Sequence, residues 1–279
     1  MMQLQKIFYF ALCLIATMQV PAQTTRTLRE TLRLQMLNGP GTMGAGVAFH
    51  GKYRYYYASI AGNIKHPMAI FNIVGERISP GDLATMFDTR GIWFNPAAKT
   101  IQAGGFGNYG IISYVIDEYG IPYNTQEVFK GNWMHDDQAS ATMNPRDTLL
   151  YILDRNIVRA YHPVTGKSVI EKNIVLKPGV FKPKPPRPNQ PPVVVPEADT
   201  LLNAYNNTSI AFTSLLNAEI GLLNLRDKAI ELYSRSEGIM TQKLLLPADA
   251  PVSKRLNFSF ANNIYWLYDA RNRVWIGYR

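Results

Sequence analysis

Four short polar segments contain the residue types that could do chemistry, and each lies directly before an apolar run. The segment 135–138 (His-Asp-Asp-Gln) has the most options, because adjacent carboxylates beside an imidazole can ligate a hard cation or share a proton in acid–base work. The other segments are 88–90 (Asp-Thr-Arg), 206–207 (Asn-Asn) and 254–255 (Lys-Arg). The candidate ligand-binding residues are therefore Asp88, Arg90, His135, Asp136, Asp137, Asn206, Lys254 and Arg255.

The acidic residues in these segments leave two interpretations open. Asp88 could act with Asp136 or Asp137, since glycoside hydrolysis needs two carboxyl groups about 5–10 Å apart. Asp in a loop more commonly accepts hydrogen bonds from the nearby backbone and forms a turn. Asp88 could also pair with Arg90 as a structural ion pair. Because a sequence contains no distances, it identifies no catalytic residue and leaves any metal site unknown.

The chain lacks the common catalytic and cofactor motifs. There is no Gly-x-Ser-x-Gly elbow, no His-Glu-x-x-His pair and no Gly-Lys-Ser/Thr phosphate loop. The glycine-rich stretch 104–110 lies between two apolar segments and precedes no predicted helix, so it indicates a long hairpin loop. We therefore expect no cofactor, and binding is favoured over catalysis.

One pattern recurs five times: an apolar strand, a polar turn, a second strand, another turn and a third strand. A large apolar residue marks the end of the first strand in each copy, at intervals of 45, 49, 69 and 46 residues. A glycine follows the third strand in four copies, as the positive φ of a tight hairpin favours. The long interval contains residues 177–196, with eight prolines, which we interpret as an insertion rather than a linker between two domains. The apolar markers are Phe49, Phe94, Met143, Phe212 and Phe258, and the glycines are Gly75, Gly120, Gly166 and Gly238.

A repeat of about 46 residues with three or four strands is typical of a β-propeller blade. The chain resembles the β-propeller superfamily, and most of all its secreted NHL-like and WD40-like members, although the Gly-His and Trp-Asp signature of WD40 blades is absent. We expect an all-β fold, a single five-bladed propeller over residues 23–279. In that fold the loops before the innermost strands lie at one face, so the resemblance implies that the four polar segments converge on one rim.

An N-terminal strand is expected to close the ring. The chain ends at Arg279, directly after the third strand of the fifth copy, so another segment must supply the outer strand of that blade. Residues 31–37 alternate apolar and polar side chains, as a strand does. A helix over 27–37 is the alternative, because Leu28, Leu32 and Met36 recur every four residues. The strand is favoured, since an open ring would leave an unpaired sheet edge.

Residues 1–22 are predicted to be a secretory signal peptide, with Lys6, an apolar run over 7–20 and a small-residue cleavage pattern ending at Ala22. The run is shorter than the roughly 20 apolar residues of a spanning helix, so a retained anchor is the less favoured alternative. The only cysteine, Cys13, lies in this segment, and the mature chain would have no disulfide. We expect a secreted, periplasmic or cell-surface protein with no transmembrane segment after signal removal.

The chain is basic, with 29 Lys and Arg against 20 Asp and Glu. Such a charge favours anionic partners, or it serves only to keep the protein soluble. The basic residues are scattered, so we expect no nucleic-acid partner. The sequence thus predicts an exported, non-enzymatic module that binds a protein or an anionic glycan. The alternative is a carbohydrate-active hydrolase or lyase that uses Asp88, Asp136 or Asp137.

Overall fold

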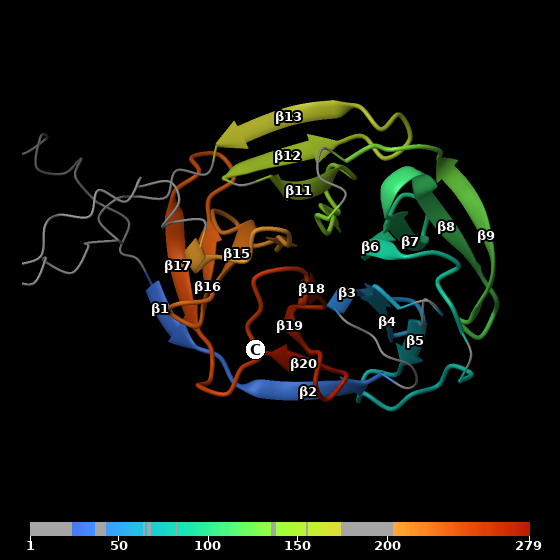
Figure 1. Cartoon of the computed structure of the whole chain (residues 1–279), viewed down its shortest axis with the longest axis horizontal. Helices are drawn as coiled ribbons and strands as arrows, with labels where there is room; N and C mark the ends of the chain where they lie inside the picture. The colour runs from blue at the N-terminus through green and yellow to red at the C-terminus, as the bar shows by residue number, and fades with distance from the viewer. Residues whose placement is uncertain are drawn as a thin grey trace, which may run out of the picture.

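The computed structural model describes residues 24–36, 43–63, 65, 68–81, 83–134, 138–154, 156–173 and 203–279. They form five sheets around a central axis, which confirms the predicted all-β, five-bladed propeller (Figure 1). The predicted signal peptide 1–22 and the proline-rich insertion 177–196 lie outside the described residues. No helix among the described residues is both long and apolar enough to cross a membrane.

Each blade begins with its innermost strand and continues outward by antiparallel hairpins. The first blade contains β3 (Met43–His50), β4 (Tyr55–Ala61) and β5 (Met68–Phe71). The second contains β6 (Thr89–Asn95), β7 (Thr100–Gly105), the 3₁₀ turn η1 (Gly107–Tyr109), β8 (Ile111–Ile116) and β9 (Pro122–Phe129). The third contains β10 (Thr142–Met143), β11 (Leu150–Asp154), β12 (Ile157–Tyr161) and β13 (Ser168–Asn173).

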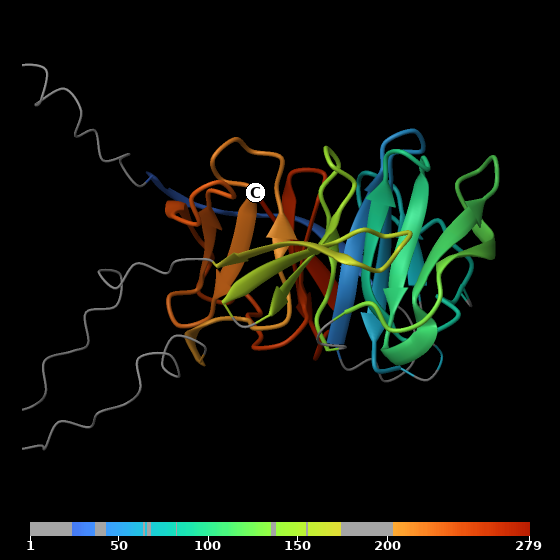
Figure 2. The ribbon, with the colours of Figure 1, turned by 90° about the horizontal axis from the view of Figure 1, so that it is seen from above.

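The last two blades also contain strands from the N-terminus. The fourth contains β14 (Ala211–Phe212), β15 (Ile220–Asn224), β16 (Ala229–Tyr233), β17 (Met240–Leu245) and, outermost, β1 (Thr24–Thr27). The fifth contains β18 (Phe258–Ala261), β19 (Ile264–Asp269), β20 (Val274–Tyr278) and, outermost, β2 (Glu30–Gln35). Seen from the side, the strands near the blade centres run along the ring axis from one face to the other (Figure 2).

The N-terminal segment closes the ring as a strand, so the prediction of a strand is confirmed and a helix over 27–37 is wrong. β2 pairs antiparallel with β20, and Leu34 lies opposite Trp275. The segment also does something the sequence did not indicate, because β1 pairs in parallel with β17 of the neighbouring blade. A single short segment therefore joins the edges of the fourth and fifth blades.

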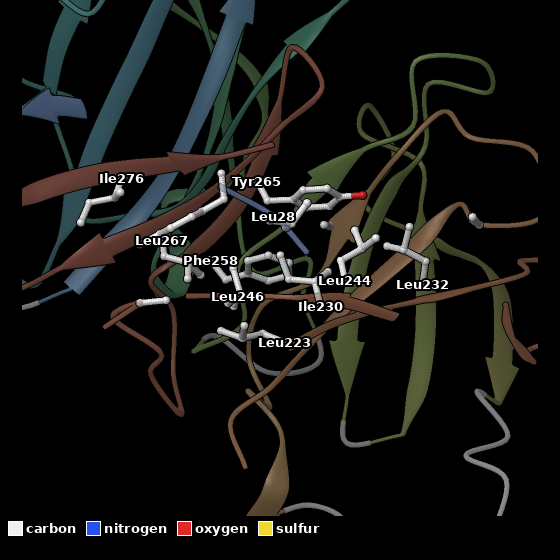
Figure 3. Close-up of a cluster of buried hydrophobic side chains, with 14 of the residues drawn as sticks. Leu28, Leu223, Ile230, Leu232, Leu244, Leu246, Phe258, Tyr265, Leu267 and Ile276 are labelled. Atoms are coloured by element: carbon white, nitrogen blue, oxygen red, sulfur yellow. The ribbon is translucent and has the colours of Figure 1, made fainter. Parts of the chain in front are cut away.

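The hydrophobic core consists of layers between adjacent blades. Figure 3 shows the layer between the fourth and fifth blades, in which Leu28 from the N-terminal segment lies among side chains of both sheets. Fully burying an aliphatic or aromatic side chain stabilises the fold by about 1.5–3 kcal/mol. The labelled residues are Leu28, Leu223, Ile230, Leu232, Leu244, Leu246, Phe258, Tyr265, Leu267 and Ile276.

The tyrosines of the first blade join it to the second. Tyr57 donates a hydrogen bond to the carbonyl of Gly120 at 2.8 Å, and Tyr53 donates one to the carbonyl of Asp117 at 3.0 Å. Gly120 has φ +87°, and a Cβ added there would lie 2.9 Å from the Tyr55 ring. The glycine marker of this repeat thus provides both a left-handed turn and close packing between blades.

Candidate ligand-binding site

The central channel has two different ends. The innermost strands begin at one end, which we call the incoming end. They finish at the other, which we call the hairpin end, because the hairpins to the second strands follow there. The polar segments 88–90, 206–207 and 254–255 lie at or shortly before the starts of innermost strands, so they belong to the incoming end.

At the incoming end, Asp88 and Arg90 form an ion pair with 2.9 Å between Oδ1 and Nη1. Asp88 Oδ1 also accepts a hydrogen bond from the backbone of Gly62 at 2.8 Å. Only 7% of the Arg90 side chain is exposed, and its guanidinium lies over the Phe106 ring, 4.6 Å from the centroid. Both side chains therefore have partners within the propeller, as expected of the structural ion pair that the sequence left open.

Asn206, also at the incoming end, is fully buried and organises the loop before β14. Its amide nitrogen donates to the carbonyls of Ser253 and Leu256, at 2.9 and 2.7 Å. Its amide oxygen accepts the backbone N–H groups of Thr208 and Ser209, at 3.1 and 2.8 Å. All four hydrogen bonds are internal, so this side chain is engaged in holding the loop together.

The remaining candidates are on the surface or outside the described residues. Lys254 and Arg255 are exposed, and Lys254 Nζ donates to Asn203 Oδ1 at 2.8 Å. The backbone of Lys254 accepts a hydrogen bond from Asn207 at 3.1 Å. The described candidates therefore form two separate groups. Asp88 and Arg90 contact each other, and hydrogen bonds join the loop that contains Asn206 to the loop that contains Lys254. His135, Asp136 and Asp137 lie outside the described residues.

Direct contacts between innermost strands close the channel at the incoming end. Ser140 Oγ donates to the carbonyl of Ala45 at 3.0 Å, a bond that crosses the axis because the third and first blades are not neighbours in the ring. The backbone of Ala141 donates to the carbonyl of Arg90 at 3.0 Å. Gly91, with φ +111°, makes this approach possible, since a Cβ there would lie 2.4 Å from the Ala141 oxygen. A ligand therefore cannot pass between these strands.

At the hairpin end the innermost strands surround a cavity of about 220 Å³. All five blades contribute to its wall, and every apolar residue that marks a repeat lines it. The lining residues are Val47, Ala48, Phe49, Ile92, Trp93, Phe94, Ser140, Ala141, Thr142, Met143, Pro145, Ile210, Phe212, Ser214, Phe258, Ser259, Phe260, Ala261, Asn262 and Asn263.

The lining is apolar apart from six Ser, Thr and Asn side chains, and it contains no charged residue among those described. Three of the six are already engaged within the fold, through Ser140 to Ala45, Ser259 to Val47 and Asn262 to Tyr56. The side chains of Thr142, Ser214 and Asn263 make no hydrogen bond to the described part of the chain. The cavity can therefore desolvate an apolar group and offer it a few polar contacts.

The repeat markers were the sequence signal for this cavity, although their spacing was interpreted only as evidence of blades. Four of the markers lie at or next to the end of an innermost strand, whereas Phe258 begins β18, so the expectation that it ends the first strand is wrong. One large apolar residue on each innermost strand still implies five such side chains around one axis. We placed the candidate site at the opposite end, because polar segments suggested chemistry and apolar ones suggested packing.

His50 lies beside the cavity wall, against the ring of the lining residue Phe94. The centroid of its ring is 4.7 Å from those of both the Tyr53 and the Phe94 ring. Its Nε2 atom is 3.1 Å from the Lys99 carbonyl oxygen, and its Nδ1 atom is buried without a hydrogen-bond partner. Burial lowers the pKa of His50 below its usual 6.5, against the opposing effect of the Lys99 carbonyl, while the charge of Lys52 lowers it further. The neutral ring is therefore the native form.

We expect acid to destabilise the protein through His50. Because its folded pKa lies below its unfolded pKa, its contribution to stability is complete above about pH 6.5 and is lost as the pH falls through the folded pKa. Urea unfolding at pH 7.5 and 5.0 should show a decrease that is smaller in His50→Gln, whose amide can still donate to Lys99. An equal decrease in both proteins would contradict this role.

Comparisons with known proteins identify the fold and no family. No family model and no curated protein matches the sequence. A crystal structure of glutaminyl cyclase from Myxococcus xanthus matches with a TM-score of 0.52 and 8% identity, covering 92% of this chain and 97% of that chain. Virginiamycin B lyase from Staphylococcus aureus matches with a TM-score of 0.39 and 14% identity, over 86% of this chain and 67% of that one. A chain of a nidogen–laminin complex matches with a TM-score of 0.40 and 12% identity, over 84% and 74%.

The five sheets, together with the match to the glutaminyl cyclase, define the class of protein as a β-propeller. At 8% identity the glutaminyl cyclase shows the shared fold alone, and the other two scores are too low to support an argument. The resemblance to NHL-like and WD40-like propellers stays a resemblance.

Proposed function

We propose that this chain is an exported, non-enzymatic binding module whose hairpin-end cavity receives one large apolar side chain of a protein partner. The observation that carries the proposal is the cavity wall, to which each of the five blades contributes a large apolar marker residue. The predicted signal peptide supports export. A rigid ring with a pocket at one face is a suitable platform for binding, because its wall is fixed by five sheets.

The size and chemistry of the cavity favour an amino-acid side chain over a sugar. Its 220 Å³ is below the roughly 300–1,000 Å³ of most small-molecule pockets. A sugar ring has several hydroxyl groups that need partners when buried, and only Thr142, Ser214 and Asn263 are uncommitted here. A single buried apolar anchor is instead what dominates many protein interfaces.

The same wall does not support the carbohydrate-active alternative at this cavity. Acid–base hydrolysis needs an acid and a second carboxylate near the scissile bond. Among the described lining residues there is no Asp, Glu, His, Lys or Arg. Asp88 lies at the other end of the innermost strands, in an ion pair with Arg90, and Asp136 and Asp137 lie outside the described residues.

A matched pair of tryptophan substitutions tests the proposal. Ser214 lines the cavity and is exposed, whereas Leu216 lies in the same hairpin, is 75% exposed and is not part of the wall. Ser214→Trp is expected to fill the mouth with its own indole, and Leu216→Trp adds the same group outside it. The probe is a displayed library of random 12-residue peptides, selected on the purified wild-type protein.

We expect the selected peptides to share one large apolar residue and to lose at least tenfold in affinity for Ser214→Trp while retaining it for Leu216→Trp. Equal affinity for both variants would place binding elsewhere and overturn the proposal. Failure to select any peptide, together with binding to an oligosaccharide array, would support a glycan ligand instead.

A further inference from the structure

The charged residues around the cavity mouth indicate which chemical groups the protein partner carries beside its apolar side chain. We infer that the apolar side chain that enters the cavity belongs to an acidic segment of the partner, with carboxylates on both sides of it. This inference rests on the proposed function. The basis is the charge of the hairpins that surround the mouth.

Three of the five hairpins at this end carry exposed basic residues. The innermost strand of the first blade is followed by Lys52 and Arg54, that of the second by Lys99, and that of the third by Arg146. Arg146 Nη2 donates to the carbonyl of Ser214, a lining residue, at 3.1 Å, which places this guanidinium at the mouth itself. Within the described residues none of the four cations forms an ion pair with a carboxylate.

The carboxylates of the same hairpins are committed to contacts within the fold. Asp147 Oδ2 lies 2.9 Å from Arg235 Nη1 and accepts a hydrogen bond from Tyr151 at 2.8 Å. Glu219 accepts the backbone N–H groups of Asn217 and Arg235, at 3.2 and 3.0 Å. Arg235 balances the charge of Asp147, so these hairpins carry four cations against the one remaining carboxylate charge of Glu219.

An uncharged cavity with unpaired cations around it is complementary to an apolar residue flanked by acidic ones. The cavity would desolvate the anchor, while the exposed cations attract the flanking carboxylates across water. Exposed ion pairs contribute up to about fivefold in affinity each, and they weaken as salt is added. Complementary charge also accelerates association and discourages basic partners.

Two peptides that differ only in their flanking charges test this inference. Each is a fluorescein-labelled nine-residue peptide with a central phenylalanine, flanked by aspartates in one peptide and by lysines in the other. A third peptide keeps the aspartates and replaces phenylalanine by glycine. Fluorescence anisotropy gives their Kd values at low and at physiological ionic strength. We expect the aspartate peptide to bind at least tenfold more tightly than the lysine peptide, with a preference that decreases as salt is added.

Two double substitutions with the same change in net charge locate the attraction. Arg54 and Lys99 have φ values of +58° and +54°, so Asn, which tolerates the left-handed region, is a conservative replacement for fold stability. The control is Lys130→Asn with Arg271→Asn, two exposed residues that do not belong to the hairpins around the cavity. We expect Arg54→Asn/Lys99→Asn to weaken the aspartate peptide about fivefold or more and the control pair to leave its Kd unchanged.

The possible results separate this inference from the proposed function. If the aspartate and lysine peptides bind equally and both lose affinity for Ser214→Trp, the cavity binds an apolar anchor but the acidic flanks are wrong. If the glycine peptide binds as tightly as the phenylalanine peptide, binding is purely electrostatic and the proposed function fails with the inference. If both double substitutions weaken binding equally, the attraction comes from net charge and the hairpin cations have no special role.

Discussion

Replacing Glu231 by alanine is expected to lower the free energy of unfolding by about 3–5 kcal/mol, because several buried polar groups lose their common partner. Glu231 is fully buried in β16. Its carboxylate accepts hydrogen bonds from Tyr205 at 2.7 Å, Tyr233 at 2.9 Å and Asn224 at 2.9 Å. Lys243 Nζ lies 3.8 Å from it. Burial, and then the charge of Glu231, raise the pKa of both tyrosines well above the usual value, so they remain donors at working pH.

Urea unfolding at pH 7 measures this effect. Glu237→Ala, at an exposed position in the following turn, is the matched control, and its effect should stay within about 0.5 kcal/mol. Glu231→Leu combined with Tyr233→Phe should cost less than the sum of the two single changes, because the two residues share one network. A loss below about 1 kcal/mol for Glu231→Ala would contradict the network's role.

Substitution of Leu34 is expected to weaken the contact between β2 and the fifth blade, which closes the ring. Leu34 is fully buried in β2 and packs in the layer that contains Trp266 and Trp275. Leu34→Ala should cost about 2–5 kcal/mol through the cavity it leaves. Leu34→Asp should prevent stable closure altogether, because a buried charge without a partner costs several kcal/mol more.

Thermal unfolding of Leu34→Ala and limited trypsin digestion of Leu34→Asp measure the two effects. Arg33→Ala, on the exposed side of the same strand, is the control and should change stability by less than about 1 kcal/mol. If Leu34→Asp resists trypsin as well as the wild type does, closure through β2 is not essential to the fold.

The repeating strands were predictable because each blade needs the same alternation of buried strands and tight turns. The four marker glycines all have positive φ, between +63° and +87°, as their turns require. Ring closure followed from the absence of an outer strand in the last blade. The parallel pairing of β1 was not predictable, because its exposed Thr-Thr-Arg-Thr sequence has no apolar face to fix a partner.

The outer edge of the first blade was also not predictable from the repeat pattern. Its described residues form no regular fourth strand, and residues after β5 occupy that edge irregularly. Ile78 donates to the Ile70 carbonyl at 2.9 Å, and Met68 donates to the Leu83 carbonyl at 3.0 Å. Edge hydrogen bonds can be satisfied in this way without any periodic signal in the sequence.

The site was harder to predict than the fold for a physical reason. Polar and charged residues are the usual candidates for a site in a sequence. Here, however, the polar groups of Arg90 and Asn206 hold loops together at the closed end of the channel. The open end is built from residues such as Phe49 and Phe94, which appear in a sequence as ordinary core. Only the arrangement of five innermost strands around one axis, a three-dimensional property, turns them into a cavity wall.

Methionine methyl NMR tests most directly which end of the channel binds the partner. Met143 lines the hairpin-end cavity, whereas Met86 is 70% exposed and lies two residues before Asp88 at the incoming end. With ¹³C-methyl methionine labelling, titration of the aspartate-flanked phenylalanine peptide should shift the Met143 resonance and leave that of Met86 unchanged. A shift of Met86 with Met143 unmoved would contradict the account and return the binding site to the rim that contains Asp88.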